Sequence, residues 1–465
     1  MSTPSPLPAG TPSVPALTRH MGLVALIIFG VGDMVGAGIY GTIGTAAGLM
    51  GNAVWLAFAL AMCAAVLTGL SYASISSRYP RAAGAAYVTQ RAFGMPLISY
   101  VVGLAVCASG LTSMAATTNV FTENLQAIIP PLQTWAGRLA IIFVFLGLLT
   151  FVNFWGIRES IWLNAICAAV EVGGLLFVIA LGARFWGTVD YLQTPPGVPL
   201  STTLMLSGAV LTFFAFIGFE DMLNMAEEVK NPERTMPWGM IIAIGIVTLL
   251  YIAIAVTAVS VVPFAQLANT TANGAPFTQI TRVTAPWLSP WVFTFITLFA
   301  VTNTGLINYI MGSRLVYGMS RQRLLPAFLG KVHPNRRTPH VAIFVLGLIV
   351  LTLAVTGNVK QLASSTSLLL LNCFAVINGA LIVLQRRPGE ARGRFEVPTI
   401  IPGLGVLVCV GLIAGRLSTA YREGNLTGDL LTTACMFAAI LALYGIMRPK
   451  QVGEGDEVMH DKQKS

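Results

Sequence analysis

Two apolar stretches of this sequence carry residues that such stretches rarely keep. Residues 30–41 hold five glycines with Asp33 among them, and residues 213–221 read Phe-Phe-Ala-Phe-Ile-Gly-Phe-Glu-Asp. Glycine inside a helix costs about 1 kcal/mol relative to alanine, and an acid at the centre of a membrane helix costs about 2.5 to 3.5 kcal/mol. The two stretches therefore predict interrupted helices and a polar site within an apolar protein.

Acids are the groups at this site that can exchange protons or bind cations. Asp33, Glu171 and Glu220 fall within apolar segments or at their interruptions, and Asp221 follows Glu220 directly. An acid in such a setting pairs with another group, takes up a proton or faces a cavity. The chemistry that these residues predict is ion or proton binding beside a polar solute.

The composition places these acids in a membrane protein. Hydrophobic residues make up 55% of the 465 residues and charged residues 10%, whereas soluble domains carry about 25% charged residues. A bilayer core of about 30 Å takes about 20 apolar residues as a helix, because lipid offers no partner to backbone amides. The sequence predicts an all-α polytopic protein with twelve spans, at residues 21–48, 53–75, 97–126, 137–156, 160–181, 203–228, 237–262, 289–319, 338–356, 361–385, 400–418 and 428–447.

The basic residues predict the orientation. With twelve spans and both termini in the cytoplasm, 21 of the 27 Lys and Arg residues fall in cytoplasmic loops and tails. The outer loops hold the other six, which are Arg138, Arg184, Arg282, Lys360, Arg416 and Arg422. This positive-inside pattern supports the span count and the orientation. The expected location of this multi-pass protein is a bacterial inner membrane. The net charge of +9 could suggest a nucleic-acid partner. The placement of the basic residues argues against it.

The two interrupted segments occupy equivalent places in the chain. Each opens a block of five spans, which is typical of an inverted repeat whose broken helices meet at the bilayer midplane. Half-helix N-termini there attract a carboxylate, and unwound carbonyls accept hydrogen bonds from an ammonium. Close helix packing is an equally good explanation for Gly32 and Gly36 taken alone. Position in the chain is what favours a site for a zwitterion.

An enzyme, a metal site and a cofactor site are not expected. The four histidines, His20, His333, His340 and His460, map to cytoplasmic loops or ends. The glycines from Gly30 to Gly36 do not follow a strand, which excludes a dinucleotide fingerprint. The six cysteines lie inside predicted spans without metal or disulfide spacing, so we interpret them as small residues of helix packing.

Several motifs resemble those of the amino acid, polyamine and organocation (APC) superfamily of transporters, in its amino acid permease branch. They occur in the family's order from roughly residue 20 to 400. The runs are Gly36-Ala-Gly-Ile-Tyr40, Arg78 to Tyr87 with Arg91-Ala-Phe-Gly94, Gly156-Ile-Arg-Glu-Ser160, Gly218-Phe-Glu220, Ala226 to Pro237, Ser313 to Arg321, Leu325-Pro326, His333-Pro334 and Thr338-Pro339.

This resemblance implies the fold and the substrate site. The fold is the five-plus-five inverted repeat of the bacterial leucine transporter with two further helices. The expected division is a tail at 1–18, repeats at 19–182 and 200–386, the last two helices at 398–448 and a tail at 449–465. By position, the carboxylate end of the substrate meets Val35, Gly36, Ala37, Gly38 and Ile39. Its ammonium and side-chain end meets Phe214, Phe216, Ile217, Gly218, Phe219 and Glu220, and in several relatives an aromatic residue at the position of Phe214 closes over the substrate.

The coupling site departs from some relatives. Glu171 stands where some proton-coupled relatives carry a lysine, next to the first helix. Our hypothesis is that Asp33 and Glu171 approach each other and share a proton or bind a cation; the alternative is a protonated, purely structural Glu171. Asn303 and Thr304 either complete that site or form packing hydrogen bonds. Glu220 faces the substrate ammonium, responds to pH or fixes the loop between the broken helices.

The expected function is secondary active transport of amino acids by alternating access, with a proton, or else sodium, as the coupling ion. An exchanger of amino acids, amines or polyamines on the same fold is the main alternative, and a receptor that moves no substrate is another. Phe214, Phe216 and Phe219 lean toward a neutral or hydrophobic substrate. The sequence does not indicate an oligomeric state.

Overall fold

A computed structural model describes residues 21–79, 84–155, 161–225, 229–270, 275–321, 324–334, 336, 338–390, 392–422 and 428–447. The predicted tails at 1–18 and 449–465, His20 and His460 lie outside the described residues. So do the motif Gly156 to Ser160 and parts of the motifs that begin at Arg78 and Ala226.

The described chain is almost entirely helical. Its elements, in chain order, are α1 (Leu23–Met34), α2 (Ala37–Met50), η1 (Gly51–Ala53), α3 (Val54–Arg78), α4 (Gly84–Phe93), α5 (Pro96–Ile128), η2 (Pro130–Leu132), α6 (Trp135–Trp155), α7 (Ile161–Gly182), η3 (Ala183–Phe185), α8 (Thr202–Phe213), η4 (Phe214–Phe216), η5 (Phe219–Met225), α9 (Pro232–Val261), α10 (Phe264–Ala268), α12 (Pro276–Thr284), α13 (Pro290–Arg321), η6 (Ala327–Gly330), α14 (His340–Thr356), α15 (Val359–Arg386), α16 (Ile400–Arg422) and α17 (Gly428–Met447).

The length and composition of these helices suit a bilayer. Ten stretches within the described residues are long and apolar enough to cross a membrane, and α1 and α14 are shorter apolar helices. Large apolar side chains are exposed on the outer faces, such as Val144 on α6 and Leu249 on α9. Exposed Trp135 and Trp155 stand at the two ends of α6, where an aromatic belt would meet both interfaces. The polytopic all-α class is confirmed, and the number of twelve spans stays a prediction.

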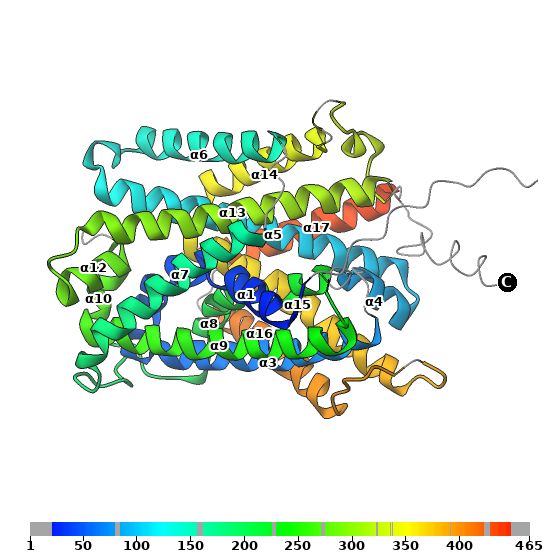
Figure 1. Cartoon of the computed structure of the whole chain (residues 1–465), viewed down its shortest axis with the longest axis horizontal. Helices are drawn as coiled ribbons and strands as arrows, with labels where there is room; N and C mark the ends of the chain where they lie inside the picture. The colour runs from blue at the N-terminus through cyan, green and yellow to red at the C-terminus, as the bar shows by residue number, and fades with distance from the viewer. Residues whose placement is uncertain are drawn as a thin grey trace, which may run out of the picture.

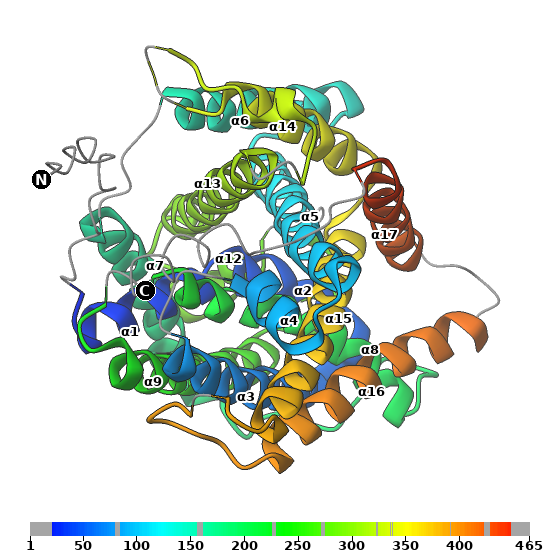
Figure 2. The same cartoon turned by 90° about the vertical axis from the view of Figure 1, so that its right-hand side faces the viewer.

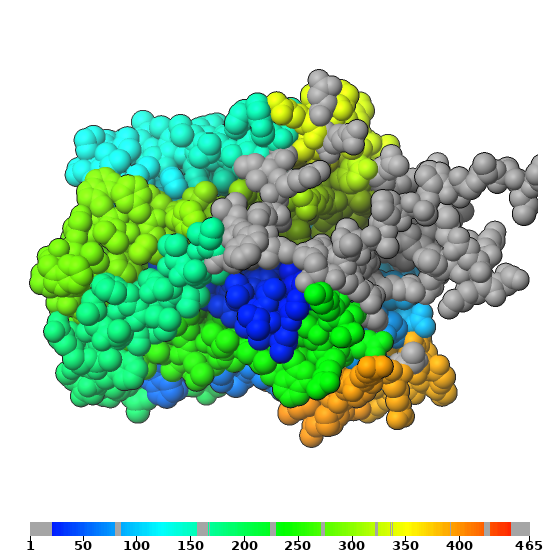
Figure 3. Space-filling view, viewed as in Figure 1, coloured from blue at the N-terminus to red at the C-terminus, as the bar shows by residue number. Residues whose placement is uncertain are grey.

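The helices run along one common direction with the broken segments among them (Figure 1). Short helices α10 and α12 lie at one end of the bundle and α4 at the other. Seen along the helices, α2 is enclosed by longer helices, while α16 and α17 lie at the periphery (Figure 2). The other half of the first broken helix, α1, reaches the surface between α7 and the segment that leads into α9 (Figure 3).

The structure differs from two predictions from the sequence. The short helices α4, α10 and α12 were not predicted, because each is too short to give an apolar period of membrane length. Cys63 and Cys435 are exposed on the helix surface, so they are not internal packing residues; Cys107, Cys373 and Cys409 are buried as predicted. Nothing is described for the side chain of Cys167.

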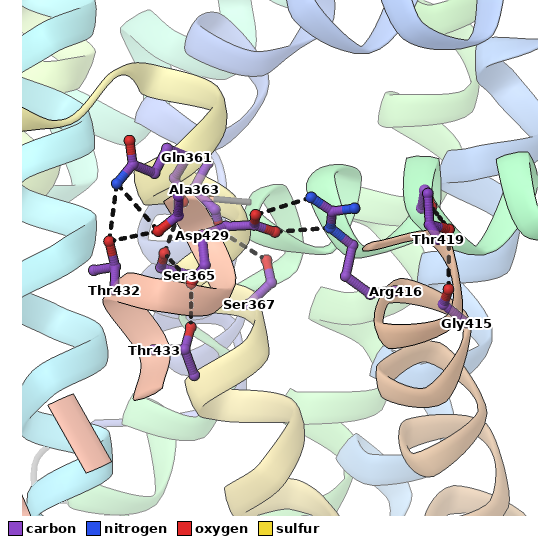
Figure 4. A network of polar contacts seen from close by, with 12 residues as sticks. Gln361, Ala363, Ser365, Ser367, Gly415, Arg416, Thr419, Asp429, Thr432 and Thr433 are labelled. Carbon is purple, nitrogen blue, oxygen red and sulfur yellow. Dashed lines mark hydrogen bonds and ion pairs between the residues drawn. The ribbon is translucent and has the colours of Figure 1, made fainter. Parts of the chain in front are cut away.

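Arg416, one of the six basic residues expected on the outer side, lies within α16. It makes a two-pronged ion pair with Asp429 of α17 at 2.7 and 2.8 Å. The side of the membrane on which this pair lies stays a prediction. Beside this pair, Gln361 of α15 donates to the Gly428 carbonyl, and Ser365 donates to the Asp429 carbonyl at 3.0 Å (Figure 4). These bonds attach both C-terminal helices to α15.

Candidate substrate site

The first helix breaks where the glycine-rich stretch predicted an interruption. α1 ends at Met34, and Val35 is extended at φ −82° and ψ 103°. α2 starts again at Ala37, and its N-cap residue Gly36 supplies no side-chain cap. Thr304 of α13 accepts a hydrogen bond from the Ala37 amide at 3.2 Å. A helix N-terminus with this little capping presents backbone N–H groups to an anion.

The second predicted interruption is also present. α8 ends at Phe213, one turn of η4 follows, and Ile217 is extended at φ −65° and ψ 139°. Gly218 has φ +126°, a conformation that residues with a Cβ rarely adopt. The chain resumes in η5 from Phe219. The unwound residues of both segments thus lie at Val35–Gly36 and Ile217–Gly218.

The two breaks touch each other in the protein interior. A Cβ on Gly218 would lie 2.9 Å from the Asp33 carbonyl carbon and 3.0 Å from the Met34 nitrogen. A Cβ on Gly38 would collide with the backbone of Ala215. Only glycine permits this approach, so the two glycine positions explain why the broken segments can meet.

Tyr251 of α9 joins the two breaks, and sequence reasoning missed it. Its hydroxyl lies 2.7 Å from the Met34 carbonyl and 2.9 Å from the Ala215 carbonyl, and the side chain is fully buried. The only signal in the sequence was a tyrosine in the middle of an apolar span. Since tyrosines are also common in ordinary packing, that signal did not distinguish it.

The phenylalanines of the second break differ in their surroundings. The Phe216 ring packs 5.2 Å from Tyr251, and the Phe219 ring packs 5.2 Å from Phe374 of α15 and 5.8 Å from Tyr72 of α3. Phe214 is also buried, and no aromatic ring contacts it among the described residues. Phe216 and Phe219 therefore hold the break against neighbouring helices, which leaves Phe214 as the ring best able to face a solute.

Glu220 folds back onto its own break. Its carboxylate accepts a hydrogen bond from the Gly218 amide at 2.9 Å, and the residue is 9% exposed. This bond satisfies a donor that the unwinding of the helix releases. Of the three roles open to Glu220 from the sequence, the geometry favours the one that fixes the loop.

Glu171 of α7 lies behind the first break and is fully buried. Neither carboxyl oxygen has a hydrogen bond of good geometry to another described residue, although the Asn303 amide of α13 lies close to it. The Tyr40 hydroxyl of α2 donates to the Glu171 carbonyl at 2.8 Å. A buried acid without a fixed partner is uncommon, and it calls for an explanation in terms of a bound proton or ion.

The four residues assigned to coupling fall into two neighbourhoods. Glu171 and Asn303 lie near each other, and Thr304 follows on the same helix and reaches Ala37. Asp33 lies at the end of α1 against Gly218 of the second break. The direct approach of Asp33 to Glu171 stays a prediction. No cluster of metal-binding side chains occurs in the part of the chain that is described.

The arrangement offers complementary groups to a zwitterion. The start of α2, whose own N-cap residue Gly36 supplies no side-chain cap, favours a carboxylate. The carbonyls at the ends of α1 and α8 are acceptors for an ammonium. Val35, Ala37, Ile39 and Phe214 are buried there. Water is therefore largely excluded, which strengthens such polar contacts.

Comparisons with known proteins identify the family of this chain. The sequence profile described as amino acid permease matches residues 21–446. The branched-chain amino acid permease BcaP of Bacillus subtilis is 29% identical over 426 residues, which is 87% of this chain and 90% of that protein. The methylthioribose transporter of the same bacterium is 28% identical over 85% of this chain and 88% of that protein. The chloroplastic cationic amino acid transporter 9 of Arabidopsis thaliana is 31% identical over 69% of this chain and 58% of that protein.

These relatives are permeases and transporters, not enzymes, and the family profile spans both interrupted helices and the helices that enclose them. The chain therefore belongs to the amino acid permease family of the APC superfamily and is a multi-pass membrane transport protein.

Proposed function

We propose that this protein is a secondary active carrier that moves amino acids by alternating access, with the substrate held between α1–α2 and α8–η5. The observation that carries this proposal is the meeting of two unwound segments in the buried middle of the bundle. Around them we propose twelve spans in two inverted repeats, in a bacterial inner membrane with both termini in the cytoplasm.

The proposed substrate is a neutral amino acid with an apolar side chain. Phe214 and Ile217 offer an apolar surface beside the break, and Glu220 is already engaged by the Gly218 amide. A cationic side chain would need a free carboxylate at that end of the site. The name of the Bacillus relative, branched-chain amino acid permease, agrees with this choice, whereas the plant relative is named for cationic amino acids.

Counterflow in reconstituted vesicles tests the carrier. Vesicles loaded with unlabelled leucine should accumulate external labelled leucine faster than empty vesicles, and loading with lysine should stimulate less. Binding of leucine in a thermal-shift assay without counterflow would identify a receptor instead. Stimulation by lysine alone would contradict the apolar substrate class.

The proposed coupling group is Glu171, with Asn303 and Tyr40 beside it. A buried carboxyl without a fixed partner suits a proton that comes and goes. A proton gradient, acidic outside, should then drive net uptake into empty vesicles. Uptake only after loading with internal substrate would favour the exchanger.

Glu171→Gln tests this assignment, because glutamine keeps the size of the side chain and cannot ionise. We expect the variant to lose the pH dependence of uptake and to keep exchange. Glu233→Gln is the matched control, since Glu233 is a 45% exposed acid at the start of α9. An unchanged pH response in Glu171→Gln would remove Glu171 from the coupling role.

A further inference from the structure

Most of the connection between α15 and α16 lies across the ends of three other elements. Its charged side chains contact α3, α4 and the start of α9. This is the end of the bundle where α4 lies, opposite to α10 and α12 (Figure 1). We call residues 387–390 and 392–397 the α15–α16 segment.

Glu390 is the centre of the first group of contacts. Its carboxylate accepts hydrogen bonds from the Tyr79 hydroxyl at 2.6 Å and from Arg91 Nε of α4 at 2.7 Å, and the side chain is only 6% exposed. Arg387 donates to the carbonyls of Arg91 and Ala92, both at 2.7 Å. Hydrogen bonds to a charged group are stronger than neutral ones, so this group holds α4 firmly to the end of α15.

A second group of contacts fixes the segment to α3. Glu396 pairs with Arg78 at 2.7 Å and accepts from the Gly393 amide at 2.7 Å. The Phe395 amide donates to Ser77 Oγ at 2.9 Å. A Cβ on Gly393 would lie 2.9 Å from the Ser77 carbonyl carbon and 3.0 Å from the Arg78 nitrogen. The segment is thus pressed against the backbone of α3.

The elements that the segment joins belong to different parts of the bundle. α3 packs closely on α9, where Gly69 leaves room for the side chain of Ile244. It also packs on the second break, where the ring of Tyr72 contacts the ring of Phe219. α4 is separated from α5 only by Gly94 and Met95. Alternating access moves one such group of helices against the other around a fixed site. Opening at this end would separate α3 from α4 and stretch the contacts of the α15–α16 segment.

We infer that the α15–α16 segment is a latch that closes the cytoplasmic end of the transport path, with Glu390 as the group that ties α4 to it. This inference rests on the proposed alternating access and on the proposed orientation. The latch must release before α3 and α4 can separate. Its strength therefore sets the equilibrium between closed and open states at this end.

Glu390→Gln tests the latch without any substrate. Hydrogen–deuterium exchange of the purified protein should be about tenfold faster in residues 69–79 and 84–93, because one charged partner is lost from a nearly buried cluster. Arg394→Gln is the matched control on the same segment. Arg394 forms an ion pair with Glu233, and the side chains of the two residues are 80% and 45% exposed. We therefore expect no change in hydrogen–deuterium exchange.

A thiol readout separates opening from local loosening. Ser74, one turn before the end of α3, is fully buried, so Ser74→Cys should react with an impermeant maleimide only when this end opens. The reaction should be about tenfold faster when Glu390→Gln is added, above the background of the parent protein. Faster exchange without faster labelling would mean that the segment only stabilises the local structure. That result would contradict the proposed latch.

Gly393→Ala supplies an independent variant, because its Cβ displaces the segment from α3 without removing a charge. It should raise labelling of Ser74→Cys in the same direction. Unchanged exchange and labelling in both variants would refute the latch even if transport is demonstrated. Absence of transport would refute the proposed function and leave these two readouts intact.

Discussion

Gly218 combines an unusual backbone conformation with surroundings that leave little room for a side chain. Its φ of +126° is unfavourable for other residues, and a Cβ would lie 2.9 Å from the Asp33 carbonyl carbon. Strain at such a position costs about 1 to 3 kcal/mol. We expect Gly218→Ala to lower the thermal unfolding temperature and to reduce leucine uptake at least about tenfold.

The control for this substitution is Gly147→Ala on α6. A Cβ on Gly147 meets nothing within 4 Å, and the residue lies inside a regular helix. Alanine should be neutral or stabilising there by up to about 1 kcal/mol. Equal losses in the two variants would show that Gly218 has no special role.

Tyr251 is the second residue for which a single atom can be tested. Tyr251→Phe removes the hydroxyl that lies between the Met34 and Ala215 carbonyls and keeps the ring contacts with Phe58 and Phe216. A buried carbonyl left without a donor costs about 1 to 3 kcal/mol. We expect a raised KM for uptake, by about tenfold, with the control Tyr421→Phe unchanged because Tyr421 is 89% exposed. A normal KM would leave Tyr251 as a packing residue.

At the scale of elements, both broken helices could be predicted from the sequence. Gly36 and Gly218 stand in apolar runs next to acids, and that local pattern conflicts with a continuous membrane helix. The roles of Phe216, Phe219 and Tyr251 could not be predicted, because each depends on a contact with a residue far away in the chain. The α15–α16 segment could not be predicted for the same reason. The partners of its Glu390, Tyr79 and Arg91, lie about 300 residues earlier in the chain.

A buried ion pair between Arg416 and Asp429 joins α17 to α16. Removing one partner from such a pair costs about 3 to 5 kcal/mol, so Asp429→Asn should lower the unfolding temperature and expose α17 to protease. The double variant Arg416→Met/Asp429→Leu removes both charges and should recover most of that loss. A double variant as unstable as the single one would show that the attraction within the pair, not the cost of an unpaired buried charge, accounts for the loss.

The α15–α16 segment should keep its ion pairs over a wide pH range. Burial raises the pKa of the Glu390 carboxyl, but hydrogen bonds from Tyr79 and Arg91 and the charges of Arg91 and Arg387 lower it more, to below its ordinary 4.5. Burial and the bond to Glu390 raise the pKa of Tyr79 to about 12, so it stays a donor. Stability from a depressed acid pKa is present above the unfolded value and is lost as pH falls through the folded value.

The measurement is the difference in unfolding temperature between wild type and Glu390→Gln. It should be constant above about pH 5 and should shrink below the unfolded pKa of 4.5. A difference that grows in acid would contradict the assigned charge state. Arg394→Gln should show little difference at any pH.

At the scale of the whole molecule, the charge pattern makes a prediction that labelling can check. Leu192 follows a loop that bonds to η1 and the start of α3, at the α10 end of the bundle. Phe328 lies in η6, beyond the far end of α13. The two residues are 54% and 50% exposed. With both termini in the cytoplasm, Leu192→Cys should react with an impermeant maleimide added to intact cells, and Phe328→Cys should react only after lysis. The opposite result would invert the proposed topology and place the latch outside.

Hydropathy alone was enough to predict an all-α membrane protein, because a chain of this composition has few alternatives to a helix bundle in lipid. It did not predict the partner of Arg416, since a paired charge within a helix looks the same in sequence as a loop charge at the end of a span. Charge placement predicts an orientation from side-chain numbers, whereas the pairing of Arg416 with Asp429 depends on how α16 and α17 pack.

Tyr251 also has a consequence in simple hydrogen-bond stoichiometry. Its phenol carries one hydrogen, yet two backbone oxygens lie within bonding distance of it. At any instant one of these two carbonyl oxygens therefore receives no hydrogen from Tyr251. An ammonium brings three hydrogens, so its arrival would end this competition between the two helices by supplying a donor to each.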